Sequence, residues 1–431
     1  MQQYPFPTWR DFIAENWERK PISFRDPDSG LCNESAVFEG LMCAADELRA
    51  GSIRDHRDVS FHLANAVIID PGPYLPLCSD SLGDYLARME TSLGNQPFAL
   101  LVNNFQEFSP RLCFHMRLFA RNLFEHLGML PAGTVSSHVM LARYAVSPFA
   151  VHKDPNSVFT FMIRGKKTLR VWPFEVFADR TQQPFAKHRQ LNLYDFNYLP
   201  FQETGIPLSG EHGDVLYWPS TYWHVGETDG DSVHISLHLT FDLHSEPRGE
   251  AVDLLHKVVE ESLSEADWHS GYPFRNICES GLVHPPNELM QALRTLTHAA
   301  QDAIEDSVKA LWLSRMSAQG FWTVARRSSN TAITTVDATG TILQGDPIFP
   351  AYWAVSDGNL MLAAHGQVIR FPMRDWTEQF LTALSKRRPF RIADLAPQTI
   401  NVWDEIATVA KKLVAIGALQ IVGESCSIST S

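Results

Sequence analysis

The chain has 431 residues, of which 45 % are apolar and 20 % charged; this excludes a disordered protein and leaves room for two or three domains. The formal net charge of −13 argues against a nucleic-acid partner, because a phosphate backbone attracts a positive surface. We expect a cytoplasmic protein with no membrane contact. The six cysteines form no CxxC pair, the N-terminal residues lack a signal-peptide pattern, and no apolar run approaches the roughly 20 residues that span a bilayer.

Helices are expected first along the chain. Residues 7–20 carry apolar and aromatic side chains at helical spacing, and Thr8 is placed to cap that helix. The segments 81–95 and 110–128 also have the pattern of helices. Between residues 135 and 243, short β-rich runs alternate with turns, which is typical of an antiparallel sandwich or barrel.

The second half of the chain has a different pattern. Helices are expected at 250–265 and 286–318, and the latter has an apolar stripe that would pack on its own domain or on a second copy in a homodimer. Short strands, two helices and a closing strand follow, which suggests a winged-helix-like module. We therefore expect three domains: residues 1–245, a helical region at 246–318, and a C-terminal domain at 319–431.

A candidate metal site begins in the segment AVHKDPNSVF, at residues 150–159. His152 and Asp154 are two residues apart, and such residues point to the same side of an extended strand, so both can reach one ion. Further along, the strand-like segment DVLYWP leads into a turn that presents His224. Two histidines and one carboxylate form the facial triad of non-haem Fe(II) oxygenases, which leaves coordination positions open for other ligands.

The third ligand has competitors. A His-x-Asp pair alone is weak evidence in a chain with 17 histidines, and His212, His234 and His238 are further candidates. We prefer His224 because its context, GDVLYWPSTYWHVGE, combines a strand with a following turn.

A lysine pair follows the first metal motif. The run SVFTFMIRG reads as a strand and a turn, after which KTLRVWP returns antiparallel. On that return strand Lys167 shares a face with Leu169 and Val171, whereas Lys166 lies on the other face. A lysine on the inward face of a barrel needs an anionic partner, which a carboxylate of a bound co-substrate would provide. The alternative is that both lysines are exposed turn residues.

Together these motifs resemble the JmjC branch of the cupin oxygenases. The segments WRDFIAENWERKPISF, HKDPNSVFTFMIRGKKTLRVWP, GDVLYWPSTYWHVGE and SVHISLHLTF match, in the family's order, its entry helix, first metal motif, second metal motif and following barrel strand. The resemblance implies a double-stranded β-helix, the cupin jelly-roll barrel, with flanking helices in an α+β fold. It also implies Fe(II), dioxygen and 2-oxoglutarate, with the far carboxylate of 2-oxoglutarate bound to Lys167.

Further contacts with the co-substrate are expected from polar residues on strands that border the site. Tyr144, Asn156, Thr160 and His238 are the candidates, and each is equally well explained as a hydrogen-bonded polar group of the barrel.

The layout of the whole chain is similar to that of bacterial ribosomal-protein oxygenases, in which a JmjC barrel precedes dimerisation helices and a winged helix. Those enzymes often have arginine at the position of Lys167, and a lysine there is similar to asparaginyl hydroxylases. The resemblance therefore implies a homodimer and leaves the substrate open.

Three functions are compatible with these features. The first is hydroxylation of a side chain in a protein or peptide, either a ribosomal protein or the precursor of a peptide natural product, with release of succinate and CO2. The second is hydroxylation of an amino acid or another small molecule. The third is a non-catalytic cupin and winged-helix regulator. The motifs do not select hydroxylation over demethylation.

Overall fold

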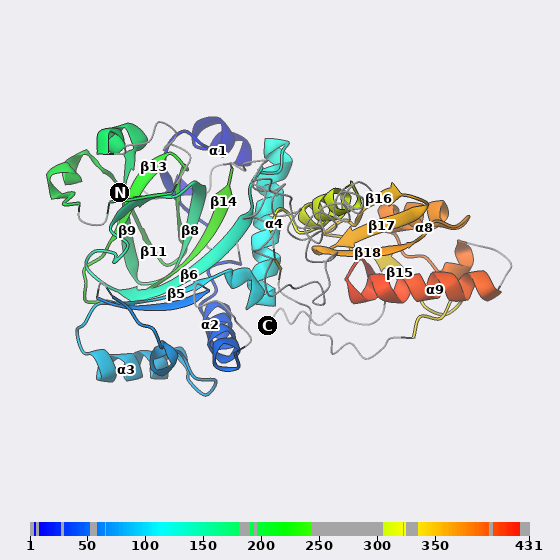
Figure 1. Cartoon of the computed structure of the whole chain (residues 1–431), viewed down its shortest axis with the longest axis horizontal. Coiled ribbons are helices and arrows are strands. Elements are labelled where there is room, and N and C mark those ends of the chain that lie inside the picture. The colour runs from blue at the N-terminus through cyan, green and yellow to red at the C-terminus, as the bar shows by residue number, and fades with distance from the viewer. Residues whose placement is uncertain are drawn as a thin grey trace, which may run out of the picture. The chain divides into compact units, whose positions relative to one another are not determined.

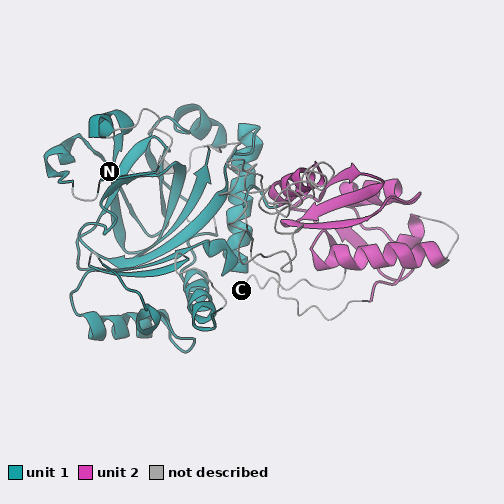
Figure 2. Ribbon diagram, viewed as in Figure 1, with its two compact units in different colours: residues 1–244, 318–333, 425–431 teal, residues 245–317, 334–424 magenta. Residues whose placement is uncertain are grey.

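The computed structural model describes residues 4–5, 8–26, 30–51, 58–64, 66–180, 190–193, 196–243, 305–321, 323–324, 335–395 and 400–422 (Figure 1). The chain divides into two compact units (Figure 2). The first comprises residues 1–244, 318–333 and 425–431, and the second comprises 245–317 and 334–424. The helix expected at 250–265 and most of the one expected at 286–318 lie outside the described residues. The homodimer and the boundaries at 245 and 318 therefore stay predictions.

The helices of the first unit begin at capping side chains. They are α1 (Trp9–Glu15), α2 (Glu34–Arg49), α3 (Leu82–Leu93) and α4 (Pro110–Leu127). Thr8, Asn33, Ser81 and Ser109 each accept a hydrogen bond from a backbone N–H in the first turn, which confirms the expected role of Thr8. Helix α1 ends earlier than the apolar spacing predicts. Glu18 has a φ of +51°, in the left-handed region that ends a right-handed helix.

Two β-sheets make up the rest of the first unit. A nine-stranded sheet has the order β1-β2-β12-β8-β14-β6-β5-β3-β4, antiparallel except for the β1–β2 pair. Its strands are β1 (Tyr4–Pro5), β2 (Ile22–Arg25), β3 (Val59–Leu63), β4 (Ala66–Val67), β5 (Phe98–Asn103), β6 (Val135–Arg143), β8 (Asn156–Arg164), β12 (Asp214–Trp218) and β14 (His234–Asp242).

The second sheet has five antiparallel strands in the order β10-β7-β13-β9-β11. They are β7 (Val151–Lys153), β9 (Lys166–Pro173), β10 (Leu191–Leu193), β11 (Ile206–Glu211) and β13 (Tyr222–Glu227). An α+β fold with antiparallel sheets is thus observed. The expected jelly-roll barrel is not closed, because no strand pairing in the described part of the chain joins the two sheets into one.

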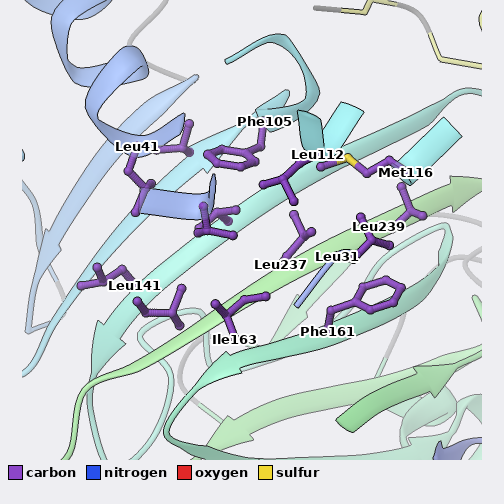
Figure 3. Packing of buried hydrophobic residues seen from close by; sticks show 14 of the residues in the cluster. Leu31, Leu41, Phe105, Leu112, Met116, Leu141, Phe161, Ile163, Leu237 and Leu239 are labelled. Atoms are coloured by element: carbon purple, nitrogen blue, oxygen red, sulfur yellow. The ribbon is translucent and has the colours of Figure 1, made fainter. Parts of the chain in front are cut away.

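The central strands of the larger sheet have two buried faces. Along β8, Phe159, Phe161 and Ile163 belong to the main hydrophobic core. In Figure 3, Phe161 and Ile163 lie near Leu237 and Leu239 of β14, and Leu112 and Met116 of α4 pack over the same layer. The alternate residues, such as Thr160, point to the opposite face, because side chains alternate along a strand. Burying each large apolar side chain contributes roughly 1.5–3 kcal/mol, so this layer holds the sheet against its helices.

The second unit has a separate hydrophobic core. Residues 305–317 are helical. The other elements are β15 (Leu343–Gly345), β16 (Tyr352–Ser356), β17 (Asn359–Ala364), β18 (Gln367–Pro372), α8 (Thr377–Lys386), α9 (Ile400–Ala415) and β19 (Leu419–Ile421). β16, β17 and β18 form one antiparallel sheet, and β15 pairs with β19. The winged-helix-like assignment stays a prediction. Among the described helices, none has the length and apolar character needed to cross a membrane.

Candidate metal centre

A cavity of about 270 Å³ is lined by residues from both sheets of the first unit. The larger sheet contributes its inward side chains from β5, β6, β8, β12 and β14, and the smaller sheet contributes β7, β9, β10 and β13. This volume lies just below the range of roughly 300–1,000 Å³ that is typical of ligand pockets, so the cavity suits a small molecule together with one side chain. All three residues of the expected metal triad line it.

The structure brings His152, Asp154 and His224 together. His152 on β7 and His224 on β13 are direct partners across the two strands, and Asp154 follows β7 immediately. The Asp154 Oδ2 atom lies 3.9 Å from His152 Nε2 and 3.7 Å from His224 Nε2. One ligand atom from each residue lies within 4.8 Å of the other two.

These separations fit a shared metal ion. Distances of 3.7 and 3.9 Å are too long for hydrogen bonds, yet they suit ligand atoms that each bind one ion at roughly 2.0–2.2 Å. The His152 Nδ1 atom lies 3.1 Å from the Ala150 carbonyl oxygen, to which it donates, so its Nε2 is left free to ligate. Burial is the main cause that lowers the pKa of His224 well below its ordinary value, which keeps the ring in the neutral form that metals bind.

The turn before His224 is fixed by hydrogen bonds. The Ser220 hydroxyl donates to Glu18 Oε2 at 2.7 Å, and the buried Lys153 Nζ donates to the Ser220 carbonyl oxygen at 3.2 Å. The ring of Trp218 lies 4.9 Å from that of His224. These contacts attach the second metal motif to the first, because Lys153 lies between the two ligands His152 and Asp154.

Lys167 lies at another part of the same cavity and is only 2 % exposed. Its Nζ lies 3.4 Å from Ser236 Oγ and 3.8 Å from Met140 Sδ. No carboxylate of the described residues lies within ion-pair distance of it. Burial lowers the pKa of Lys167 to about 7. Lys166, next in the chain, is exposed. A buried ammonium without a counter-charge is a site for an anionic ligand.

The segment 122–246, which contains the metal triad and Lys167, matches the family model of the JmjC domain. This segment is a JmjC domain. Its cavity assembles the His-x-Asp…His triad that is typical of the iron- and 2-oxoglutarate-dependent oxygenases of that family.

Solved structures that align with the chain include three of YcfD from Escherichia coli. Two of YcfD, one of them described as a ribosomal oxygenase, are 16 % identical, with TM-scores of 0.45 and 0.44. A third, of YcfD with cobalt and 2-oxoglutarate, is 16 % identical with a TM-score of 0.45. Each alignment covers 98 % of this chain and 100 % of the other. No curated protein sequence matches the chain significantly.

The JmjC domain also contains a series of hydrogen-bonded polar groups, of which His138 and His238 line the cavity. Ser236 Oγ lies 3.0 Å from His238 Nε2, and His238 Nδ1 lies 2.8 Å from Thr160 Oγ1. His138 stacks on His238 with ring centroids 4.3 Å apart. Ser236 and His138 were not expected from the sequence. Strand spacing would have found Ser236, which lies two residues before His238, but His138 is placed by the pairing of β6 with β14.

The remaining candidates of the JmjC domain lie in different places. Tyr144 lines the cavity, and its hydroxyl lies 3.5 Å from Met140 Sδ. Asn156 is the first residue of β8, pairs with Asp242 and is not among the cavity-lining residues. Its role in binding the co-substrate stays a prediction. His234 is buried beside Tyr144, and His212 Nδ1 lies 2.7 Å from the Ile163 carbonyl oxygen, so neither joins the triad.

Proposed function

We propose that this protein is an Fe(II)- and 2-oxoglutarate-dependent hydroxylase of a side chain in a protein or peptide. One observation carries the proposal: a single cavity contains a metal-ligand triad and a buried lysine that lacks a carboxylate partner among the described residues. The triad suits a divalent ion, and the lysine suits the far carboxylate of a dicarboxylic acid that also reaches that ion.

Different residues of the cavity would bind the metal and the co-substrate. His152, Asp154 and His224 would hold the iron, and Lys167 would bind and orient 2-oxoglutarate. With dioxygen, the bound iron and 2-oxoglutarate supply the oxidation of a C–H bond to C–OH, with succinate and CO2 as the other products. Apolar and aromatic neighbours such as Leu169 and Trp218 line the same cavity and exclude water.

The second compact unit favours a polypeptide substrate over a free small molecule. It has its own hydrophobic core, with Phe380 and Leu413 fully buried, and so is built as a separate structural unit. An oxygenase of small molecules needs only the cavity, whereas a polypeptide offers additional surface for a second unit to bind. We extend this to a homodimer, since the long apolar stripe expected at 286–318 needs a partner surface.

Hydroxylation of an amino acid is the second candidate. A small free amino acid would fit beside the co-substrate in a cavity of about 270 Å³. A ribosomal protein and the precursor of a peptide natural product remain the two polypeptide classes that we consider.

The test is mass spectrometry of host proteins and peptides after incubation with the purified protein, Fe(II) and 2-oxoglutarate. The proposal expects a gain of one oxygen atom on a polypeptide, matched by an equal amount of succinate. The same reaction with Asp154→Ala is the control. Oxidation of free amino acids without oxidation of any polypeptide would replace the proposal with the second candidate.

A further inference from the structure

We propose that the side chain oxidised by this enzyme is an uncharged one with hydrogen-bonding groups, held by Asn103 and Asn192. This inference rests on the proposed function and specifies its substrate class. It comes from two asparagines that line the cavity, one on a strand of each sheet.

Asn192 approaches from the smaller sheet. It is the direct partner of His152 in the antiparallel pairing of β10 with β7. Directly opposed residues point to the same face of a sheet, with Cβ atoms roughly 4.5–5.5 Å apart. Asn192 lines the cavity, so its amide lies beside the first metal ligand on the cavity side.

Asn103 approaches from the larger sheet. It ends β5 and is the direct partner of His138 on β6, while Leu101, two residues earlier, pairs with Met140. All four of these residues line the cavity, which places the Asn103 amide on its inward face. The backbone of Asn103 is held by a hydrogen bond from its N–H to the Asp58 carbonyl oxygen at 2.7 Å. Its position is therefore set by the sheet and by this contact.

The charges around the cavity decide the substrate class. Its described lining contains one carboxylate, Asp154, and one ammonium, Lys167, and both are committed to the metal and the co-substrate. Ser147 and Gln190, which also line the cavity, have neutral polar side chains. A cationic or anionic side chain would lose its hydration there without gaining a counter-charge, which is costly. An amide, hydroxyl or neutral imidazole would exchange hydrogen bonds with the asparagine amides, which both donate and accept.

Binding can be measured without turnover. Fluorescein-labelled peptide libraries with one fixed central residue are titrated against the full-length protein loaded with Mn(II) and N-oxalylglycine, an unreactive analogue of 2-oxoglutarate. We expect libraries centred on Asn, Gln or His at pH 8 to bind about 30-fold more tightly than those centred on Arg, Lys or Glu. Asn103→Asp should reduce or reverse the preference for the neutral libraries over those centred on Arg or Lys, because it adds a carboxylate to the cavity. Asn103→Leu should weaken binding of the neutral libraries without favouring the cationic ones.

Asn197→Asp is the matched control, because Asn197 is exposed, does not line the cavity and undergoes the same change of charge. The same libraries and a panel of free amino acids are then incubated with the Fe(II) enzyme, 2-oxoglutarate and dioxygen. Preference for charged centres overturns this inference while the proposed function stands. Oxidation of neutral free amino acids but no peptide overturns the proposed function while the neutral specificity stands. Absence of binding and oxidation in both panels overturns both.

Discussion

His152 and His224 face each other across the pairing of β7 with β13, with ring centroids 4.1 Å apart. The two metal motifs, far apart in the chain, are thus joined by one strand pair.

Replacing His224 with Ala should weaken Fe(II) binding by at least about 100-fold and abolish turnover, because one of three ligands is lost. Anaerobic titration with Fe(II) measures the first effect and succinate release the second. His126→Ala, at an exposed helix end, should change neither. Retained iron binding in His224→Ala, with loss in His234→Ala, would show that the third ligand is wrong.

Lys167 should determine the affinity for 2-oxoglutarate. Lys167→Ala removes a charge-assisted contact to a buried carboxylate, which costs on the order of 2–4 kcal/mol, or about 30- to 1000-fold in the apparent KM for 2-oxoglutarate. Steady-state succinate release at varied 2-oxoglutarate measures the change. Lys166→Ala is the matched control, because that side chain is exposed on the other face of β9. A defect in Lys166→Ala alone would place the wrong lysine in the cavity.

The affinity for 2-oxoglutarate should also depend on pH. The pKa of Lys167 is lowered to about 7 by burial, so above that pH the side chain in the free protein is neutral and binding of the dicarboxylate must take up a proton. Affinity should therefore be nearly constant below pH 7 and fall by up to about tenfold per pH unit above it. Calorimetry in buffers of different ionisation enthalpy counts the proton. Lys167→Arg should remove the dependence, because a guanidinium stays charged throughout.

Acid should destabilise the first unit through histidines that its fold keeps neutral. Burial lowers the pKa of His138 to about 3 and that of His234 well below its ordinary value, whereas the unfolded histidine titrates near 6.5. Below pH 6.5 the unfolded state then binds more protons than the folded state, so stability falls with falling pH. The slope that each histidine contributes rises toward about 1.4 kcal/mol per pH unit as the pH falls below 6.5. Urea unfolding between pH 5.5 and 6.5 measures it. An unchanged slope in His234→Gln would show that His234 is not kept neutral by the fold.

Local sequence patterns predicted the metal triad because its three residues lie in two short motifs. His152 and Asp154 follow from strand spacing, and the buried position of Lys167 agrees with the alternation along its strand. His138, Asn103 and Asn192 were missed because strand pairing places them in the cavity. The partner of a strand depends on the whole fold, so no local pattern states it. Whether the barrel is closed could not be predicted for the same reason, because closure depends on which strands pair at the edges of the sheets.

The alternation along β8 and β14 has a consequence for how this enzyme can diverge. Leu237 and Leu239 face the helices, while Ser236 and His238 lie on the other face, on which Ser236 contacts Lys167 and His238 lines the cavity. Deleting a single residue at the start of β14 would exchange the two sets, placing a histidine in the apolar layer and a leucine beside the lysine. Insertions and deletions in these strands therefore damage packing and chemistry together. New specificities should arise by substitution on the inward face, and changes in length should be confined to the loops.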